Sequence, residues 1–526
     1  MIELLVVLVV VAPVVAGLAA WFGAARLAQP LALAGLGPSI AAGTVLATLV
    51  FADGPVRAFG GLVAVDAFGA YVLVIVLVVA GIVLAGSPGH LAHERRSGVL
   101  RAEDPGRYYA LLLWFAGGLA AVPLVDSLGL VWVAIEATTV VSALLVGFTR
   151  TPQAIEAAWK YLILGSIGIG FALLGTLLIY ASSVGVLGEA SDALAWTRLI
   201  GIAPRLDPAF VRLAFIFALA GYGTKAGLAP FHTWLPDAHS QAPSPISAML
   251  SGAALAVSLY ALARFHLVAV GTLGPAYSST LLVAFGLLSL AVALPFIVAQ
   301  GDLKRLLAYS SIEHLGLATL ALGFGGQLAL LGFTLHLASH GLAKATAFLA
   351  AGRLVAERGS RRIGRLTGSL ARSPADGMAL VVAALVLAGL PPSGIFAAEL
   401  AILFGGVSRG WGIAAAAAAL ILALAVAGLL FHVLRVAVGP AGAAQEHDAA
   451  PAGATREPDA EPAGRDQAGG EPEGGDVPDG RTRGSRNHAL LFAVPLTVVI
   501  VAGLWTPSPL RAAMDQVVLI LGGGGG

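Results

Sequence analysis

The sequence predicts an all-α membrane protein that crosses the bilayer about fourteen times. Hydrophobic residues make up 58% of the 526 residues and charged residues only 11%, less than half of the roughly 25% that soluble domains carry. Apolar runs of about 20 residues, long enough for spanning helices, recur along most of the chain. Charged residues and prolines recur at matching places in two groups of these runs, which predicts two inverted five-helix repeats.

The apolar runs define the expected helices one by one. The first run has Glu3 and no basic region before it, and it is too long for a typical signal peptide, so we interpret it as helix 1. The fourteen expected spans are residues 3–22, 31–51, 66–86, 108–124, 127–147, 159–182, 208–227, 246–270, 279–299, 305–324, 327–351, 376–404, 411–437 and 488–506.

These spans divide the chain into five parts. Residues 1–107 form helices 1–3, residues 108–270 the first repeat (helices 4–8) and residues 271–437 the second repeat (helices 9–13). Residues 488–526 form helix 14 and a tail. Residues 438–487 are rich in Pro, Gly, Ala, Asp and Glu and cannot bury a core, so we expect a disordered cytoplasmic loop there.

Basic residues in the short loops predict the orientation, because cytoplasmic loops carry an excess of Lys and Arg. The odd-numbered loops are basic and the even-numbered loops hold few basic residues. We therefore expect a multi-pass protein of the inner (plasma) membrane, with both termini on the outer side. The basic residues of the odd loops include Arg26, Arg95, Arg96, Arg101, Arg107, Arg150, Lys304, Arg305, Arg353, Arg358, Arg361, Arg362, Arg365 and Arg372.

The two repeats are recognised by their buried charges and broken helices. Glu136 lies in helix 5 and Glu313 in helix 10. Helix 7 contains Lys225 and then meets Pro230, whereas helix 12 meets Pro391-Pro392 and then reaches Glu399. The two Pro-broken helices are five helices apart, so the second unit enters the membrane from the opposite side. This arrangement is typical of inverted repeats with ion sites near the bilayer midplane.

Helix 11 carries a polar stripe. His336, His340 and Lys344 are spaced by four residues and share one helical face. One such histidine is usually structural. Three titratable groups in register, near Glu313 and His314, instead favour a path for protons.

Lysine usage supports the same interpretation. The chain has four lysines against 26 arginines, and Lys225 and Lys344 lie within or at the end of apolar segments. Arg keeps its proton in proteins, whereas a desolvated Lys can release it. Pairing with Glu, or snorkelling to the membrane surface, is the structural alternative.

Composition excludes other classes of site. The absence of cysteine excludes disulfides and thiolate-bound iron–sulfur or nickel centres in this chain. No phosphate-binding loop or convincing dinucleotide motif is present, and a net charge of +1 without a basic stripe gives no sign of nucleic-acid binding. We expect no cofactor, no metal and no catalytic redox centre here.

Three segments resemble the antiporter-like subunits of respiratory complex I, group 4 membrane-bound hydrogenases (hydrogenase-4 component F-like) and multisubunit cation/proton antiporters. They are residues 225–247, which contain the Pro-Phe-His232-Thr-Trp-Leu-Pro-Asp run, residues 304–316 and residues 336–344. The likeness extends from about residue 60 to 437 and through the last helix. It implies a proton-translocating subunit in which Glu136, Lys225, His336, His340, Lys344 and Glu399 match the family's proton-carrying residues. With the buried charges and histidines noted in this sequence, the expected stations are Glu136, Lys225, His232, Glu313, His314, His336, His340, Lys344 and Glu399.

The Ser-Ser-Ile-Glu313-His314 run is similar to the hydrogenase-type branch, so the resemblance implies a hydrogenase-type parent complex first and an NADH:quinone-type complex second. Iron–sulfur clusters, nickel–iron or flavin are then expected only in partner subunits. One departure is that residues 247–256 of helix 8 hold no Lys or His, where many relatives have one. The link from Lys225 to the second repeat must then use water, Ser251 or Glu313-His314.

Three other functions stay open from the sequence. A cation/proton antiporter subunit would work without redox coupling. An energy-coupling subunit of an inorganic-carbon transporter would need a zinc-bearing soluble partner. A purely structural membrane anchor would not need the buried charges.

Overall fold

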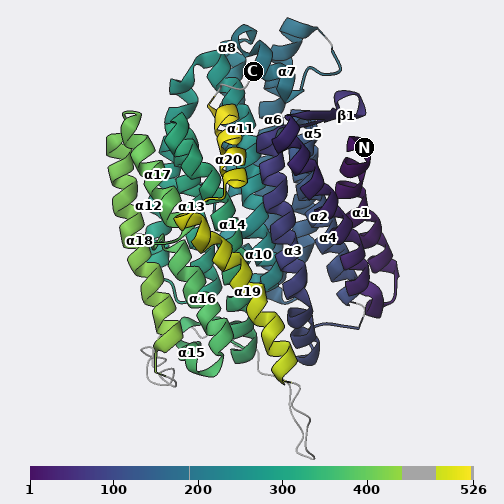
Figure 1. The fold of residues 1–526 in the computed structure, drawn as a ribbon, viewed down its shortest axis with the longest axis vertical. Coiled ribbons are helices and arrows are strands. Elements are labelled where there is room, and N and C mark those ends of the chain that lie inside the picture. The colour runs from purple at the N-terminus through teal and green to yellow at the C-terminus, as the bar shows by residue number, and fades with distance from the viewer. Residues whose placement is uncertain (103, 189, 441–480, 523–526) are drawn as a thin grey trace, which may run out of the picture.

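The computed structural model describes residues 1–102, 104–188, 190–440 and 481–522. Long helices run side by side through the molecule, from α1 at one edge to α18 at the other (Figure 1). The first half of the chain forms α1 (Ile2–Phe22), α2 (Ala28–Asp53), α3 (Ala67–Arg96), α4 (Asp104–Ala121), α5 (Leu128–Val146), α6 (Pro152–Leu187), α7 (Trp196–Ile202), α8 (Pro208–Ala226), α9 (Trp234–Gln241), α10 (Ser244–Met249) and α11 (Leu255–Leu273).

The second half continues the bundle toward the α18 edge. It forms α12 (Pro275–Val298), α13 (Leu303–Phe324), α14 (Gly326–Arg358), α15 (Ser369–Arg372), α16 (Pro374–Leu387), α17 (Gly394–Ser408), α18 (Gly412–Val438), α19 (Arg481–Leu504) and α20 (Ser508–Leu521). A π-helical turn, Leu250–Ala254, joins α10 to α11, and 3-10 turns occupy Ala25–Leu27, Phe59–Gly61, Val122–Leu124, Ala203–Arg205 and Ile363–Arg365. The short strands β1 (Val56–Ala58) and β2 (Val63–Val65) pair antiparallel, with Val56 opposite Val65.

The all-α membrane class is confirmed. In the described ranges, eleven helices are long and apolar enough to cross a membrane, or twelve if α19 and α20, which meet at a 75° bend, form one span. α14 is not among the eleven, although it has 33 residues, and it is the helix with the polar stripe. The expected span 376–404 is two shorter apolar helices, α16 and α17. The count of fourteen and the two inverted repeats stay predictions.

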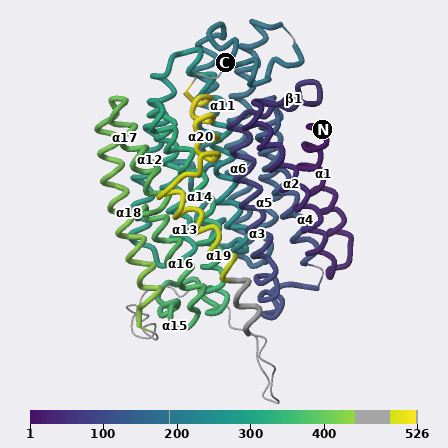
Figure 2. The backbone as a smooth tube through the Cα atoms, viewed as in Figure 1, coloured from purple at the N-terminus to yellow at the C-terminus, as the bar shows by residue number. Residues whose placement is uncertain are grey.

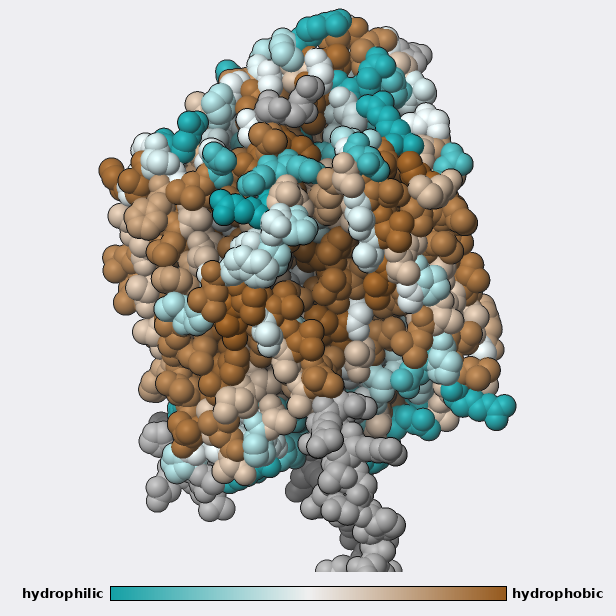
Figure 3. Space-filling model, viewed as in Figure 1, coloured by the Kyte–Doolittle hydropathy of each residue, from teal (hydrophilic) through white to brown (hydrophobic). Residues whose placement is uncertain are grey.

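The surface agrees with burial in a membrane. Figure 3 shows a broad band of hydrophobic residues on one face, with hydrophilic residues gathered toward the two ends of the bundle. Large apolar side chains such as Ile167, Phe404, Leu420 and Phe431 are more than half exposed. Such a band is typical of a surface that faces lipid.

Both expected Pro interruptions are present. α8 ends at Ala226, where Gly227 takes a left-handed conformation with φ of +75° that L side chains rarely adopt. The chain resumes a helix only at Trp234, beyond Pro230. In the second half, α16 ends at Leu387 and α17 begins at Gly394, on either side of Pro391-Pro392.

α14 occupies the middle of the molecule. It lies against α13, α16 and α17 on the side of the second half, and against α3 and α10 on the other side. Figure 2 shows α13 and α14 between the two outer groups of helices. The polar stripe of α14 is therefore enclosed by protein.

The two ends of the chain reach the same end of the bundle. α1 begins and α20 ends there, whereas α15 and the C-terminal end of α3 lie at the opposite end (Figure 1). The expected tail after residue 506 contains α20, whose Met514, Val517 and Val518 are buried. Most of the expected loop 438–487 lies outside the described residues; α18 ends at Val438 and α19 begins at Arg481.

Candidate functional site

Lys225 is the centre of a buried polar site between α5, α6 and α8. Only 2% of the residue is exposed. Its Nζ donates hydrogen bonds to Thr139 Oγ1 of α5 at 2.9 Å and to the Tyr161 hydroxyl of α6 at 2.5 Å. Tyr161 in turn shares a 2.7 Å hydrogen bond with Ser142. The ammonium group is thus bound by neutral hydroxyl groups.

Glu136 lies on α5 one turn before Thr139, and it is half-buried. Its Oε1 accepts a 2.8 Å hydrogen bond from Ser166, while Oε2 is buried without a hydrogen-bonding partner among the described residues. No ion pair joins Glu136 to Lys225 in the described part of the chain. The Lys225 amine forms its hydrogen bonds with the hydroxyl groups of Thr139 and Tyr161 instead. The Glu136 carboxylate therefore lies within electrostatic range of Lys225 without contacting it.

The stripe residues of α14 meet His314 of α13. The ring centroid of His314 lies 5.2 Å from that of His336 and 5.3 Å from that of His340. The ring centroids of His336 and His340 are 6.2 Å apart. Each of the three residues is at most 2% exposed. The structure therefore brings the predicted histidines into one buried cluster from two helices.

Lys344 continues this cluster and is fully buried. Its Nζ donates to the Leu307 carbonyl oxygen at 2.8 Å and to the Ser310 hydroxyl, both on α13. Glu313, three residues after Ser310, is 5% exposed and lies within electrostatic range of Lys344. Lys344 thus repeats the arrangement of Lys225, with a neighbouring carboxylate that forms no ion pair with it in the described ranges.

Glu399 is positioned by the break between α16 and α17. Ser393 caps the N-terminus of α17, where its hydroxyl accepts a hydrogen bond from the Phe396 amide at 3.2 Å. The Glu399 carboxylate folds back over Gly389, where a Cβ would collide with it and where φ is +59°. The half-buried Glu399 lies within electrostatic range of Glu313. The break therefore directs a carboxylate toward the α13–α14 cluster.

His232 lies in the linker between α8 and α9 and is half-buried. Its neighbour Phe231 packs against Phe285 of α12, with ring centroids 6.2 Å apart. Within the described residues, no hydrogen bond, ion pair or ring contact joins His232 to the other eight predicted residues. The structure thus gathers eight residues into two clusters and leaves His232 beside the break.

His239 of α9 was missed by the sequence reasoning. It is fully buried, and neither ring nitrogen forms a hydrogen bond of normal geometry within the described residues, although the Ser247 backbone lies close by. Its ring stacks on Phe348 of α14 at 5.2 Å and faces Trp234 at 6.4 Å. Trp234 packs on Tyr161, the partner of Lys225, at 4.6 Å.

His239 therefore lies between the two clusters. Phe348 is one turn beyond Lys344 on α14, and His239 is within electrostatic range of Lys344 and His340. Lys304, also missed as a site residue, is 4% exposed and donates to the Ala242 carbonyl oxygen at 2.6 Å. A signal existed, because His239 and Lys304 both belong to the segments that resemble the antiporter-like subunits.

A metal site does not form among these groups. In the described residues, no group of three or more His, Asp or Glu side chains surrounds a common point where an ion could bind. The three clustered imidazoles contact one another without converging, and the sequence has no cysteine. What the arrangement can do chemically is bind, hold and pass protons between neighbouring bases.

Comparison with known proteins points in the same direction. Residues 125–424 match the family model "NADH:quinone oxidoreductase/Mrp antiporter, TM". The chain is 40% identical over 353 residues to a hydrogenase-4 component F homolog of Methylacidiphilum infernorum. This alignment covers 67% of this chain and 74% of that protein. It is 36% identical over 292 residues to NADH-quinone oxidoreductase subunit N of Desulforudis audaxviator, covering 55% of this chain and 56% of that one.

The fold also has a close solved counterpart. A chain of the membrane-bound sulfane sulfur reductase, an archaeal respiratory membrane complex, superimposes with a TM-score of 0.79. The match covers 98% of this chain and 97% of that chain at 22% identity. At 22% identity the match shows the fold alone, which is that of a chain from a membrane complex.

Proposed function

The chain belongs to the NADH:quinone oxidoreductase/Mrp antiporter family of antiporter-like membrane subunits, and from this membership we propose that it translocates protons within a multisubunit oxidoreductase of the hydrogenase type. The second candidate for the parent complex is an oxidoreductase of the NADH:quinone type. The relative with the higher identity of the two described above is a hydrogenase-4 component F homolog, which supports this order.

One observation supports proton transfer most strongly. Lys225 and Lys344 are both buried, and each amine binds only hydroxyl or carbonyl oxygen atoms in the described ranges. A buried charge without an opposite charge in contact costs several kcal/mol. Each lysine is therefore suited to bind a proton when a neighbouring carboxylate approaches and to release it when that carboxylate withdraws.

The proposed path begins at Glu136 and Lys225. Movement of Glu136 toward Lys225 raises the proton affinity of the lysine amine, and movement away lowers it, because the Coulomb energy of a buried pair depends steeply on distance. Thr139, Tyr161 and Ser142 hold the lysine in its present position. His232, beside the break after α8, is the predicted station next to this site.

The path continues through His239 to the second cluster. We place His239 as the relay that replaces the absent Lys or His of residues 247–256. From His239 the proton reaches His340 and Lys344, and then Glu313, His314 and His336. Glu399, at the second break, is the last station before release. Water between these groups completes the path, because the ring nitrogens of His314 and His336 form no hydrogen bond of normal geometry to each other or to another described residue.

Orientation and partners belong to the same proposal. Both termini lie on the outer side of the plasma membrane, so the end of the bundle with α15 is cytoplasmic. Iron–sulfur clusters, nickel–iron or flavin are held by partner subunits. The two repeats comprise residues 108–270 and 271–437.

The partner set tests the parent complex. The tagged full-length chain is isolated from its native membrane in mild detergent, and the co-purifying proteins and metals are identified. A hydrogenase-like large subunit with nickel and iron supports the leading proposal, and a flavoprotein with iron alone supports the NADH:quinone type. Recovery of small hydrophobic subunits without iron or nickel contradicts redox coupling and favours a cation/proton antiporter.

A further inference from the structure

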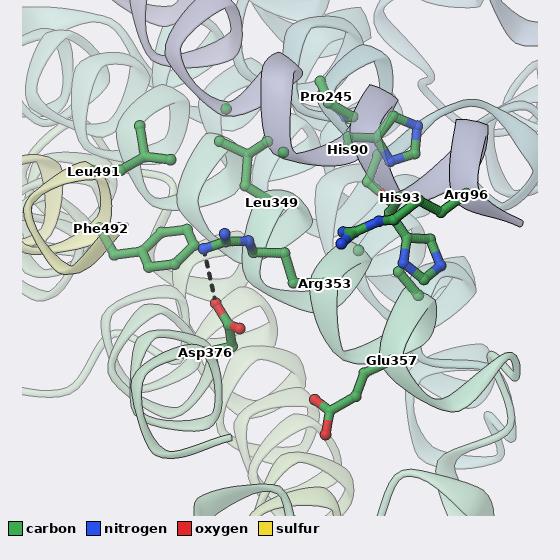
Figure 4. Close-up of a pocket in the computed structure, with 15 residues that line it drawn as sticks. His90, His93, Arg96, Pro245, Leu349, Arg353, Glu357, Asp376, Leu491 and Phe492 are labelled. Carbon is green, nitrogen blue, oxygen red and sulfur yellow. Dashed lines mark hydrogen bonds and ion pairs between the residues drawn. The ribbon is translucent and has the colours of Figure 1, made fainter. Parts of the chain in front are cut away.

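A cavity of about 280 Å³ lies at the end of the bundle where α3 and α14 terminate. Its walls come from the last turns of α3 and α14, from the first residues of α10 and α16, and from Leu491 and Phe492 of α19 (Figure 4). None of the proposed proton stations lines it. This pocket is therefore a separate feature of the molecule.

One wall of the pocket is basic. Arg96 and His93 of α3 and Arg353 of α14 line it, and His90 lies one turn deeper on α3 (Figure 4). Arg96 is exposed, and its Nε donates to the Ala92 carbonyl oxygen at 3.2 Å. No acidic residue pairs with Arg96 among the described residues, so its terminal guanidinium nitrogens are available to a ligand.

Both acidic residues of the lining already have hydrogen-bond donors, and one of these donors is itself a lining residue. Asp376 pairs with Arg353 at 3.3 Å (Figure 4). Glu357 accepts a hydrogen bond from Ser373. Among the described residues, the pocket therefore presents the guanidinium group of Arg96 without an ion pair, the Arg353 guanidinium group that also pairs with Asp376, and two imidazoles. Such a donor set favours an anion that can accept several hydrogen bonds.

A second wall, next to Arg353, is apolar. Leu349, Leu491 and Phe492 line it, and the Arg353 guanidinium lies 5.8 Å from the Phe492 ring centroid. A free phosphate ion would gain nothing from these side chains. An amphiphile with an anionic head and hydrocarbon chains would contact both walls at once.

We propose that this pocket binds the phosphate headgroup of an anionic phospholipid, with Arg96 and Arg353 on the phosphate and Leu349, Leu491 and Phe492 against the first acyl carbons. Its position at the ends of membrane helices matches the level of lipid headgroups, and basic pockets between spanning helices bind such lipids. The volume suits a headgroup rather than a whole lipid. This inference requires only that the chain lies in a membrane, and it is independent of proton transfer.

The test measures bound lipid directly. Tagged full-length protein is purified, incorporated into nanodiscs of phosphatidylcholine with a minor fraction of phosphatidylglycerol, released in the mass spectrometer and analysed for retained lipid. We expect phosphatidylglycerol to be retained in preference to phosphatidylcholine. Arg96→Gln should weaken this retention by about tenfold, the effect of losing one good charge-assisted contact. Arg95→Gln, which changes the neighbouring exposed residue outside the pocket, is the matched control and should retain lipid normally.

Arg96 is exposed and forms no ion pair with any residue that the structure describes, so its substitution should leave folding and proton movement unchanged. Thermal unfolding of each variant verifies the fold. Equal retention of both lipids by the wild type would overturn the proposal. So would equal losses in the Arg96 and Arg95 variants. Displacement of the lipid by inorganic phosphate as readily as by a short-chain phosphatidylglycerol would assign the pocket to free phosphate instead.

Discussion

At the residue scale, Lys225 and Lys344 have matching surroundings in different helices. Each amine binds oxygen atoms of the neighbouring spans, and each has a glutamate nearby that does not touch it. The sequence predicted these lysines and glutamates because charged residues are rare in apolar helices. It could not predict that hydroxyl groups of Thr139, Tyr161 and Ser310 hold the amines, because such residues are also common in helices without function.

His239 shows the limit of sequence reasoning more sharply. Its position in a short helix beside a helix break gave no periodic pattern that would place it on a buried face. Only the fold reveals that it lies between Trp234 and Phe348, and so between the two clusters.

Substitution of His239 tests the proposed link. We expect His239→Gln to slow proton translocation by about tenfold or more, because an added barrier of about 1.4 kcal/mol already produces that change. Assembly with partners should persist, since glutamine is polar and of similar length. The measurement is dye-reported acidification of inverted membrane vesicles, normalised to the amount of complex. His266→Gln, which changes another buried histidine outside the path, should leave the rate near wild type; equal effects of both variants would argue against a relay at His239.

Asp66 and Arg264 form a buried ion pair that lies outside the proposed proton path. Asp66 caps α3 through the Gly69 amide at 2.8 Å and accepts two hydrogen bonds from the fully buried Arg264, at 2.6 and 2.8 Å. The Arg264 guanidinium also lies 3.8 Å from the Trp196 ring centroid. The pair thus joins α3, α7 and α11.

Loss of that pair should destabilise the fold. Asp66→Asn leaves a buried guanidinium without its counter-charge, which costs about 3 kcal/mol or more. Asp192→Asn removes the more exposed pair with Arg198 and should cost less than about 1 kcal/mol. Thermal unfolding in detergent compares the two variants. A similar unfolding temperature for both would mean that the buried pair does not stabilise the molecule.

At the scale of elements, the positions of the helices were largely predictable. The expected spans 127–147, 208–227 and 305–324 differ by at most two residues from the bounds of α5, α8 and α13. Apolar length and the caps at Asp207 and Asp302 determine such bounds locally. The short helices α7, α9 and α20 were missed, because helices of seven to fourteen residues give a weak pattern and depend on packing against the bundle.

The contact between α14 and α17 depends on a glycine. A Cβ at Gly332 would lie 2.7 Å from Ile402 Cγ1 and 2.8 Å from the Ala398 carbonyl oxygen. Close approach of these helices holds Glu399 beside the cluster on α13 and α14. Small residues allow such packing in membrane proteins, where the hydrophobic effect does not drive helices together.

Enlarging Gly332 should separate the two helices. We expect Gly332→Val to lower the free energy of unfolding by about 1–3 kcal/mol through overpacking. Gly170→Val is the matched control, because a Cβ there meets nothing within 4 Å and the helix-propensity cost is the same. Thermal unfolding in detergent provides the comparison. If the Gly170 variant lost as much stability as the Gly332 variant, helix propensity rather than packing would explain both.

At the scale of the whole molecule, the sequence predicted the class and a common side for the two termini, and the structure places the start of α1 and the end of α20 at one end. The distribution of basic residues in the short loops predicts that this end faces the outer side of the membrane. The mutual placement of the clusters around α14 was not predictable, because contacts between distant helices leave no local signal.

Labelling of single cysteines tests the orientation, and the cysteine-free chain suits it. Both Arg57 and Arg101 are exposed, at opposite ends of α3. We expect a membrane-impermeant maleimide added to whole cells to label Arg57→Cys and to leave Arg101→Cys unlabelled until the membrane is opened. The reverse pattern would invert the proposed topology.

The central claim is that buried lysines pass protons, and one measurement addresses it most directly. Proton translocation and electron transfer are measured together in inverted membrane vesicles, energised by the electron donor that the co-purified partners accept. Lys225→Met and Lys344→Met are compared with Lys160→Met, which changes the lysine paired with Glu156 and Asp237 near the surface. We predict that both buried-lysine variants assemble but lose about tenfold or more of the protons moved per electron, whereas the Lys160 variant resembles the wild type. Normal proton translocation by assembled Lys225→Met and Lys344→Met complexes would contradict the account.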